Sequence, residues 1–169
     1  LGVGADVVSL DADWSGYKVL FLPAMFILRK EYRDKMKEYV RQGGTLFATF
    51  LTSVKDEDNT GYTESLPAGL TDLFGITVQE VEPSDARSKS HLQLSLDEAD
   101  YISLDHHWSE LLGGPAEIKA IYTEDYKAGA GVISRNSYGA GSAWYMGTMP
   151  EEEIFSLLLS AVCRDAGVR

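Results

Sequence analysis

The sequence predicts an α/β fold with a parallel core and an antiparallel extension. Residues 18–23 (KVLFLP) and 45–50 (TLFATF) are apolar without alternation, which is typical of strands covered on both faces. A helical pattern lies between them, and the order strand–helix–strand favours parallel pairing with a right-handed crossover. Several later segments alternate between apolar and polar residues, which favours half-exposed strands of an antiparallel sheet.

The first part of the chain supplies the core elements in order. Residues 5–10 (ADVVSL) form a short β-branched run that predicts a strand, and a seven-residue loop leads from it to the strand at 18–23. Residues 31–42 place apolar side chains at helical spacing, and Gly43 and Gly44 then end the helix.

The second part is predicted to contain more strands than helices. A polar loop at 51–66 precedes a short helix at 67–75, a polar and mobile connection is expected at 84–90, and 107–112 (HWSELL) reads as one helical turn. The chain closes with an amphipathic helix at 151–168, whose leading glutamates favour its positive N-terminal end. Five further strands are predicted, at 76–83, 91–96, 116–123, 130–136 and 141–148.

Length and charge exclude several classes of protein. The 169 residues suit one domain, because a (β/α)8 barrel needs roughly 200–250 residues. With 15 Lys+Arg against 26 Asp+Glu the net charge is −11, which argues against a nucleic-acid partner. No apolar run approaches the ~18 residues of a membrane span, so no membrane partner is expected. A lone Cys163 suits a reducing compartment and predicts a cytoplasmic protein.

Motifs for cofactors and metals are incomplete. Gly139 and Gly141 lie between two strands and lack the third glycine of a dinucleotide fingerprint, so they predict a tight hairpin turn. The acidic loop at 56–67 resembles a calcium loop, but Pro67 replaces the closing glutamate. The histidines, which are His91, His106 and His107, show no metal-binding spacing. The sequence therefore predicts no cofactor and no metal.

No residue stands out as a catalytic group. A nucleophile of an α/β sheet would follow the strand at 45–50, where Thr52 and Ser53 lie without a G-x-S-x-G frame. Cys163 falls in the apolar closing helix and is expected to be a buried, inert thiol. In so acidic a chain, the many carboxylates do not by themselves indicate catalytic groups with shifted pKa values. The sequence therefore predicts no catalytic residue.

The assembled string resembles the middle domain of glycoside hydrolase family 42 β-galactosidases. The resemblance is carried by ADVVSLDADWSGYKVLFLPAMFIL (5–28), YVRQGGTLFATF (39–50), VKDED (54–58), LPAGLTDLFGITVQEVEP (66–83) and SRNSYGAGSAWYMGTMP (134–150). It implies a largely parallel, flavodoxin-like or class I glutamine amidotransferase-like three-layer fold without that family's catalytic residues.

The resemblance also implies a role and partners. The family domain is known as the trimerisation domain, so the implied partners are other copies of the same chain and the parent enzyme's barrel domain. The parent hydrolyses terminal β-D-galactosides with retention, using two glutamates on a separate (β/α)8 barrel. No part of that barrel lies in these residues, so no catalytic residue is carried over.

The domain boundaries follow from the same resemblance. Residues 1–169 are interpreted as a single domain, excised from the middle of a longer chain and lacking its first strand and helix. The short loop between 5–10 and 18–23 agrees, because a helical crossover needs a dozen residues or more. The two strands would then flank a missing neighbour, and the chain is expected to self-associate through them or to rearrange them.

Two other functions stay open at this point. An active amidotransferase-like domain would need Thr52 or Ser53 as its nucleophile. A carbohydrate-binding module would need an exposed aromatic platform, for which the candidates are Trp14, Trp108, Trp144 and Tyr62.

Overall fold

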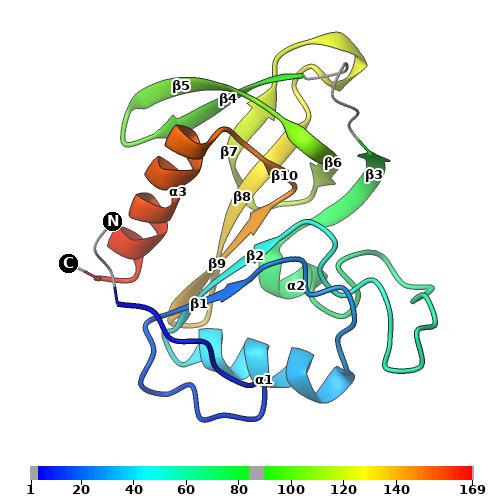
Figure 1. Cartoon of the computed structure of the whole chain (residues 1–169), viewed down its shortest axis with the longest axis vertical. Helices are drawn as coiled ribbons and strands as arrows, with labels where there is room; N and C mark the ends of the chain where they lie inside the picture. The colour runs from blue at the N-terminus through cyan, green and yellow to red at the C-terminus, as the bar shows by residue number, and fades with distance from the viewer. Residues whose placement is uncertain (1–3, 84–89, 169) are drawn as a thin grey trace.

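A single mixed sheet dominates the computed structural model, which describes residues 4–83 and 90–168 (Figure 1). Within these residues the main path of the sheet runs β1-β2-β9-β8-β7-β4-β5, and β6 pairs with β8, β3 and β10. The strands are β1 (Val19–Leu22), β2 (Thr45–Thr49), β3 (Thr77–Pro83), β4 (His91–Leu96), β5 (Ala99–Leu104), β6 (His106–Gly113), β7 (Glu117–Tyr122), β8 (Gly131–Tyr138), β9 (Gly141–Met146) and β10 (Thr148–Met149). The helices are α1 (Lys30–Arg41), α2 (Thr71–Phe74) and α3 (Glu152–Asp165), with a 3-10 turn at Asp125–Lys127.

The predicted fold class is wrong. In the described residues only β1–β2 and β2–β9 pair in parallel, and every other strand pairing is antiparallel. The fold is therefore sheet-dominated and mixed, not a largely parallel, flavodoxin-like or amidotransferase-like three-layer fold. The physical reason is that α1 makes a helical crossover between parallel neighbours, whereas the described chain has no α-helix between β3 and β10 to make another. The connections within the pairs β4–β5, β7–β8 and β8–β9 are too short for parallel pairing.

Two segments of this antiparallel part were misread from the sequence. Residues 107–112 lie in β6 and not in a helical turn, because β6 pairs along its length with β3. The strand β5 was not predicted at all. It returns from β4 through Asp97 and Glu98, whose φ angles of 51° and 66° make a tight hairpin without glycine.

The strand predicted at 5–10 is also wrong. These residues are irregular, and the Val7 side chain is fully exposed. The carbonyls of Leu10 and Ala12 accept hydrogen bonds from Lys35 Nζ, both at 2.6 Å, so a side chain of α1 fixes this segment. Among the described residues β1 pairs only with β2, which leaves the other edge of β1 open.

The parallel unit itself is confirmed. Val19 pairs with Thr45 and Leu22 with Ala48 in parallel register, and α1 makes the crossover. Leu20 is 8% exposed and Phe47 is fully buried, as continuous apolar strands require. The predicted tight turn is confirmed as well, because β8 and β9 form an antiparallel hairpin around Gly139. The connection predicted at 84–90 lies, apart from Ser90, outside the described residues.

Two apolar clusters lie on the two sides of the sheet. One contains Met36 and Val40 of α1, and the other contains Ile154 and Leu158 of α3. Helix α1 contacts β2 and β9, whereas α3 contacts β2 and shares its apolar cluster with side chains of β4 and β7 (Figure 1). No helix in the described part of the chain has the length and apolar character needed to cross a membrane.

Asp165 fastens the end of α3 to the sheet, and its removal should be measurable. Its carboxylate accepts bonds from Arg135 at 2.8 and 2.9 Å, from Ser142 Oγ at 2.6 Å and from Trp144 Nε1 at 2.8 Å. Burial acts to raise the pKa of Asp165, but these donors outweigh it and hold the pKa below its usual range. We expect Asp165→Ala to lower the free energy of unfolding by about 2 kcal/mol in urea titrations.

The matched control for this prediction is Asp34→Ala. Asp34 also pairs with a basic side chain, that of Lys30, but both side chains are more than half exposed, so its loss should cost less than about 0.5 kcal/mol. Because the pKa of Asp165 is lowered by folding, its contribution is present at neutral pH and is lost as pH falls through the folded pKa. If the two substitutions lowered the free energy of unfolding equally at pH 7, this would contradict the stabilising role assigned to the Asp165 hydrogen bonds.

Candidate functional site

The turn that follows β2 is the place where an α/β enzyme of the predicted type would carry its nucleophile. Leu51 and Ser53 have φ angles of 60° and 55°, so two non-glycine residues here adopt the left-handed conformation. Such strain is kept only where the surroundings fix it. Here the Ser53 N–H donates to Met25 O at 2.9 Å, and the Leu51 N–H donates to Glu110 Oε1 at 2.9 Å.

The hydroxyl groups of this turn are committed to the backbone. Thr52 is 1% exposed and donates to Thr49 O at 2.7 Å, and Ser53 is fully buried and donates to Ala68 O at 2.8 Å. A nucleophile needs a nearby base and access to substrate, and neither hydroxyl has such a base among its bonded partners. The half-exposed position in the turn belongs to Leu51. The geometry therefore speaks against the amidotransferase-like alternative.

Glu110 on β6 accepts a hydrogen bond from this turn, and it was not predicted from the sequence. Its side chain is 2% exposed and accepts bonds from the Leu51 N–H, from Trp108 Nε1 at 3.2 Å and from Tyr145 Oη at 2.7 Å. Burial raises the pKa of Glu110 above its ordinary value, although the three donors oppose this. The signal was hidden because residues 107–112 were interpreted as a helical turn, where a glutamate looks like a solvated residue.

A second buried polar cluster lies in the antiparallel part of the sheet. Ser109 Oγ donates to Asp105 Oδ2 at 2.7 Å and accepts from Tyr122 Oη at 2.8 Å and from Lys127 Nζ at 3.2 Å. Serine beside lysine occurs in some hydrolases, but Ser109 is 1% exposed and its proton is bonded to a carboxylate. Lys127 is paired with Glu82 at 2.7 Å, so the cluster joins β3, β6 and β7 as a structural network.

The acidic loop and the histidines, which the sequence argues against as metal sites, lie apart in the structure. Among the described residues no group of three His, Cys, Asp or Glu side chains is placed to hold a metal ion. Asp56 Oδ1 accepts the N–H groups of Asp58 and Thr60, so the acidic loop folds around its own carboxylate. His91 pairs with Glu124 at 2.8 Å, and His106 lies in β6 opposite Met149. Cys163, expected to be buried, is only half-buried.

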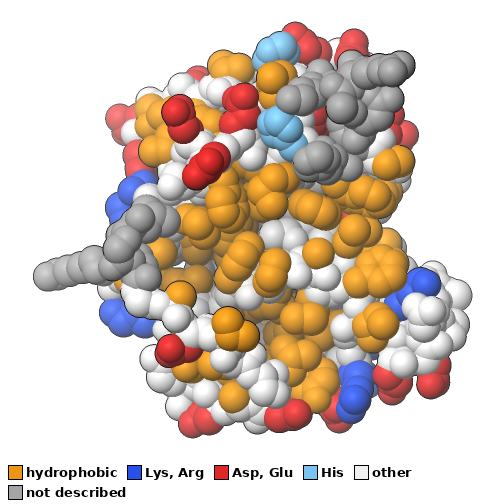
Figure 2. Space-filling model, in the orientation of Figure 1, with side chains coloured by type: hydrophobic (Ala, Val, Ile, Leu, Met, Phe, Trp, Pro, Cys, Tyr) orange, Lys and Arg blue, Asp and Glu red, His pale blue; other side chains and the backbone are white. Residues whose placement is uncertain are grey.

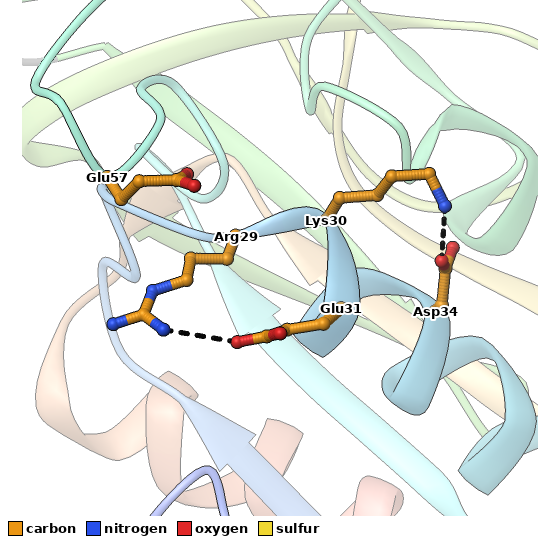
Figure 3. Close-up of a pocket in the computed structure, with 5 residues that line it drawn as sticks. All are labelled: Arg29, Lys30, Glu31, Asp34 and Glu57. Atoms are coloured by element: carbon orange, nitrogen blue, oxygen red, sulfur yellow. Dashed lines mark hydrogen bonds and ion pairs between the residues drawn. The ribbon is translucent and has the colours of Figure 1, made fainter.

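Paired charges line two surface depressions of the described part of the chain. The first, about 370 Å³, lies at the start of α1, where Arg29 bonds Glu31 and Lys30 bonds Asp34, with Glu57 alongside (Figure 3). These side chains are more than half exposed, and none is aromatic. The second, about 300 Å³, lies between α3 and the sheet and contains the Arg135–Asp165 pair. Neither depression has the enclosed, apolar lining of a substrate pocket.

The aromatic platform of the carbohydrate-binding alternative does not form. Trp14 is 4% exposed and Trp144 is 3% exposed, and the two belong to the clusters on opposite sides of the sheet. Trp108 is half-buried and stacks on Phe50 with 6.3 Å between ring centroids, whereas Tyr62 lies under Arg33. The four rings therefore share no common surface.

Comparison with known proteins decides the family. The family model of the β-galactosidase trimerisation domain, from glycoside hydrolase family 42, matches residues 1–169. The chain belongs to this family. The match agrees with the resemblance found in the sequence, and it assigns to this trimerisation domain a role in assembly.

Relatives of this trimerisation domain are much longer proteins. It is 30% identical over 168 residues to β-galactosidase LacZ of Heyndrickxia coagulans, covering 99% of this chain and 25% of that protein. A β-galactosidase structure from the Antarctic haloarchaeon Halorubrum lacusprofundi matches with a TM-score of 0.89 and 30% identity, over 97% of this chain and 24% of the other. A structure from Bacillus circulans sp. alkalophilus matches with a TM-score of 0.90 and 25% identity, over 97% and 25%. The chain thus spans about a quarter of the relatives that it matches.

Proposed function

We propose that this trimerisation domain holds three copies of a longer β-galactosidase together and contributes no catalytic group of its own. The observation that carries the proposal is the match of the trimerisation model to every residue of the chain. Two features support it: the turn after β2 presents Leu51 where an enzyme would present a nucleophile, and the hydroxyls of Thr52 and Ser53 are buried. The parent polypeptide is proposed to hydrolyse terminal β-D-galactosides, as the names of the relatives suggest.

Two readouts test this proposal. On the purified 169-residue chain we expect no hydrolysis of a chromogenic β-galactoside, because retaining hydrolysis needs two carboxyl groups roughly 5–5.5 Å apart on one scaffold. On the complete polypeptide that contains this chain, we expect light scattering coupled to gel filtration to give the molar mass of a trimer. Turnover that scales with the purified chain would contradict the non-catalytic role, and a complete polypeptide that stays monomeric at all concentrations would contradict the assembly role.

The proposed domain organisation agrees with the open edge of β1. We propose that residues 1–169 act as one domain within the longer polypeptide and that a preceding segment adds a strand and a helix beside β1. Phe21 supports this, because it is 44% exposed although it stacks on Phe47 at 5.0 Å and faces Phe155. A covering element at this edge would remove that apolar surface from water. The proposed compartment is the cytoplasm, supported by the lone Cys163.

A further inference from the structure

A continuous apolar surface lies where the parallel strands β1 and β2 end. We call it the strand-end surface, and its members are Met25, Phe26, Ile27, Phe50, Leu51 and Trp108. Ile27 is 46% exposed, and the other side chains are half-buried. Figure 2 shows apolar side chains gathered across the middle of the face that Figure 1 presents, with acidic side chains mainly toward its upper and lower ends.

Hydrogen bonds join the two segments of this surface into one unit. The Val54 N–H donates to Phe26 O at 3.0 Å, alongside the bond from the Ser53 N–H to Met25 O. The Ala24 N–H donates to Thr49 Oγ1 at 2.7 Å, and Ala24 is another left-handed residue, with a φ of 44°. Phe50 stacks on Trp108, which ties β6 to the same unit. A surface held so firmly needs little ordering when it binds, which favours binding.

The surface is free of acidic side chains in a chain that is strongly acidic. Residues 21–28 and 49–54 contain no charged residue, although charged residues make up 24% of the sequence. Glu110, which lies beneath Leu51, is buried. The charge that does lie over the surface is a cation, because Lys55 Nζ stands 5.5 Å from the centre of the Phe26 ring.

The net charge of the chain bears on how a second copy can bind this surface. Two copies with a net charge of −11 repel each other, so they can meet closely only where carboxylates are absent. An apolar surface with the cation of Lys55 over it meets that condition, and depletion of charge is typical of an interface core. In a closed trimer the contact is heterologous, which means that one face of a copy meets a different face of the next. Each copy then uses the strand-end surface once.

Resting on the proposed function, we infer that the strand-end surface is one of the two faces through which one copy of the polypeptide binds the next. The test is made on the complete polypeptide that contains this chain, by sedimentation velocity over a range of concentrations. Ile27→Asp places a carboxylate in the surface. We expect it to raise the concentration at which half of the trimer dissociates by at least about tenfold.

The matched control is Ile102→Asp on β5, which makes the same change at a side chain that is 58% exposed and outside the surface. Its dissociation should stay within about twofold of wild type. Trimers of Ile27→Asp as stable as wild type, or an equal loss in both variants, would overturn the inference while leaving the proposed function intact. A wild-type polypeptide that never assembles would overturn the proposed function itself, and the inference with it.

Leu51→Asn decides the matter if circular dichroism shows that Ile27→Asp is unfolded. Asparagine accepts the left-handed conformation of residue 51 more readily than leucine, so the turn should keep its shape while the surface loses an apolar side chain. We expect this variant also to weaken the trimer by about tenfold. A folded Leu51→Asn variant with unchanged assembly would overturn the inference.

Discussion

Gly141→Ala is expected to lower the free energy of unfolding by about 3 kcal/mol. Gly141 begins β9, directly after the hairpin turn and against the end of α1. A methyl group at this position would lie 2.2 Å from Gly44 O and 2.4 Å from Val40 O, and both atoms belong to the backbone. Backbone atoms cannot rotate away, so the hairpin must shift. That shift would disturb the parallel pairing of β2 with β9, which starts at Thr45 and Ser142.

Gly61→Ala is the control for this prediction. A methyl group at Gly61 meets no atom within 4 Å, so its effect should stay within about 0.5 kcal/mol. Urea titration followed by tryptophan fluorescence measures both variants. A Gly141→Ala variant as stable as Gly61→Ala would mean that the hairpin can move away from α1 at little cost.

The segments that the sequence predicted well are those whose pattern is local. Unbroken apolar runs located β1 and β2, and apolar spacing followed by glycines located α1 to within a residue or two. The turn at Gly139 was visible because its glycine suits a tight hairpin. These features need no knowledge of what lies beside them in the folded chain.

The segments that failed depend on partners that are distant in sequence. Residues 107–112 have apolar spacing that suits a helix, yet pairing with β3 makes them a strand. Residues 5–10 suit a strand, yet no described strand pairs with them. The turn into β5 was missed because Asp97 and Glu98 adopt left-handed φ angles, and no glycine marks this turn in the sequence. Together these errors underestimated the antiparallel part of the sheet and led to the wrong fold class.

The family and its role could be predicted from ordered motifs, whereas the geometry of the site could not. Nothing in the string FLTSV shows that Leu51 is left-handed or that Thr52 and Ser53 are buried. The partnership of Glu110 with Leu51 spans 59 positions and becomes visible only in the folded sheet. The charge-free runs at 21–28 and 49–54 were present in the sequence, but their adjacency was not.

Glu110→Ala is expected to lower the free energy of unfolding by about 3 kcal/mol, because it leaves three hydrogen-bond donors without their buried acceptor. The Leu51 N–H and Tyr145 Oη–H would lose their acceptor in the interior, and Trp108 would lose its bond at the edge. Burial also raises the pKa of Tyr145 well above its ordinary range, so this phenol stays protonated and continues to need an acceptor. Urea titration at pH 7 measures the loss.

Glu110→Gln separates the charge of this side chain from its hydrogen bonds. Because burial raises the folded-state pKa of Glu110 above its ordinary 4.5, the folded chain keeps the proton longer than the unfolded chain does. The wild-type protein should therefore lose stability relative to Glu110→Gln as pH rises above about 4.5, until the folded pKa is passed. Taking the difference between the two proteins at each pH cancels the other titrating groups. A difference that instead grows in favour of wild type with rising pH would show that the three donors, and not burial, govern this carboxyl.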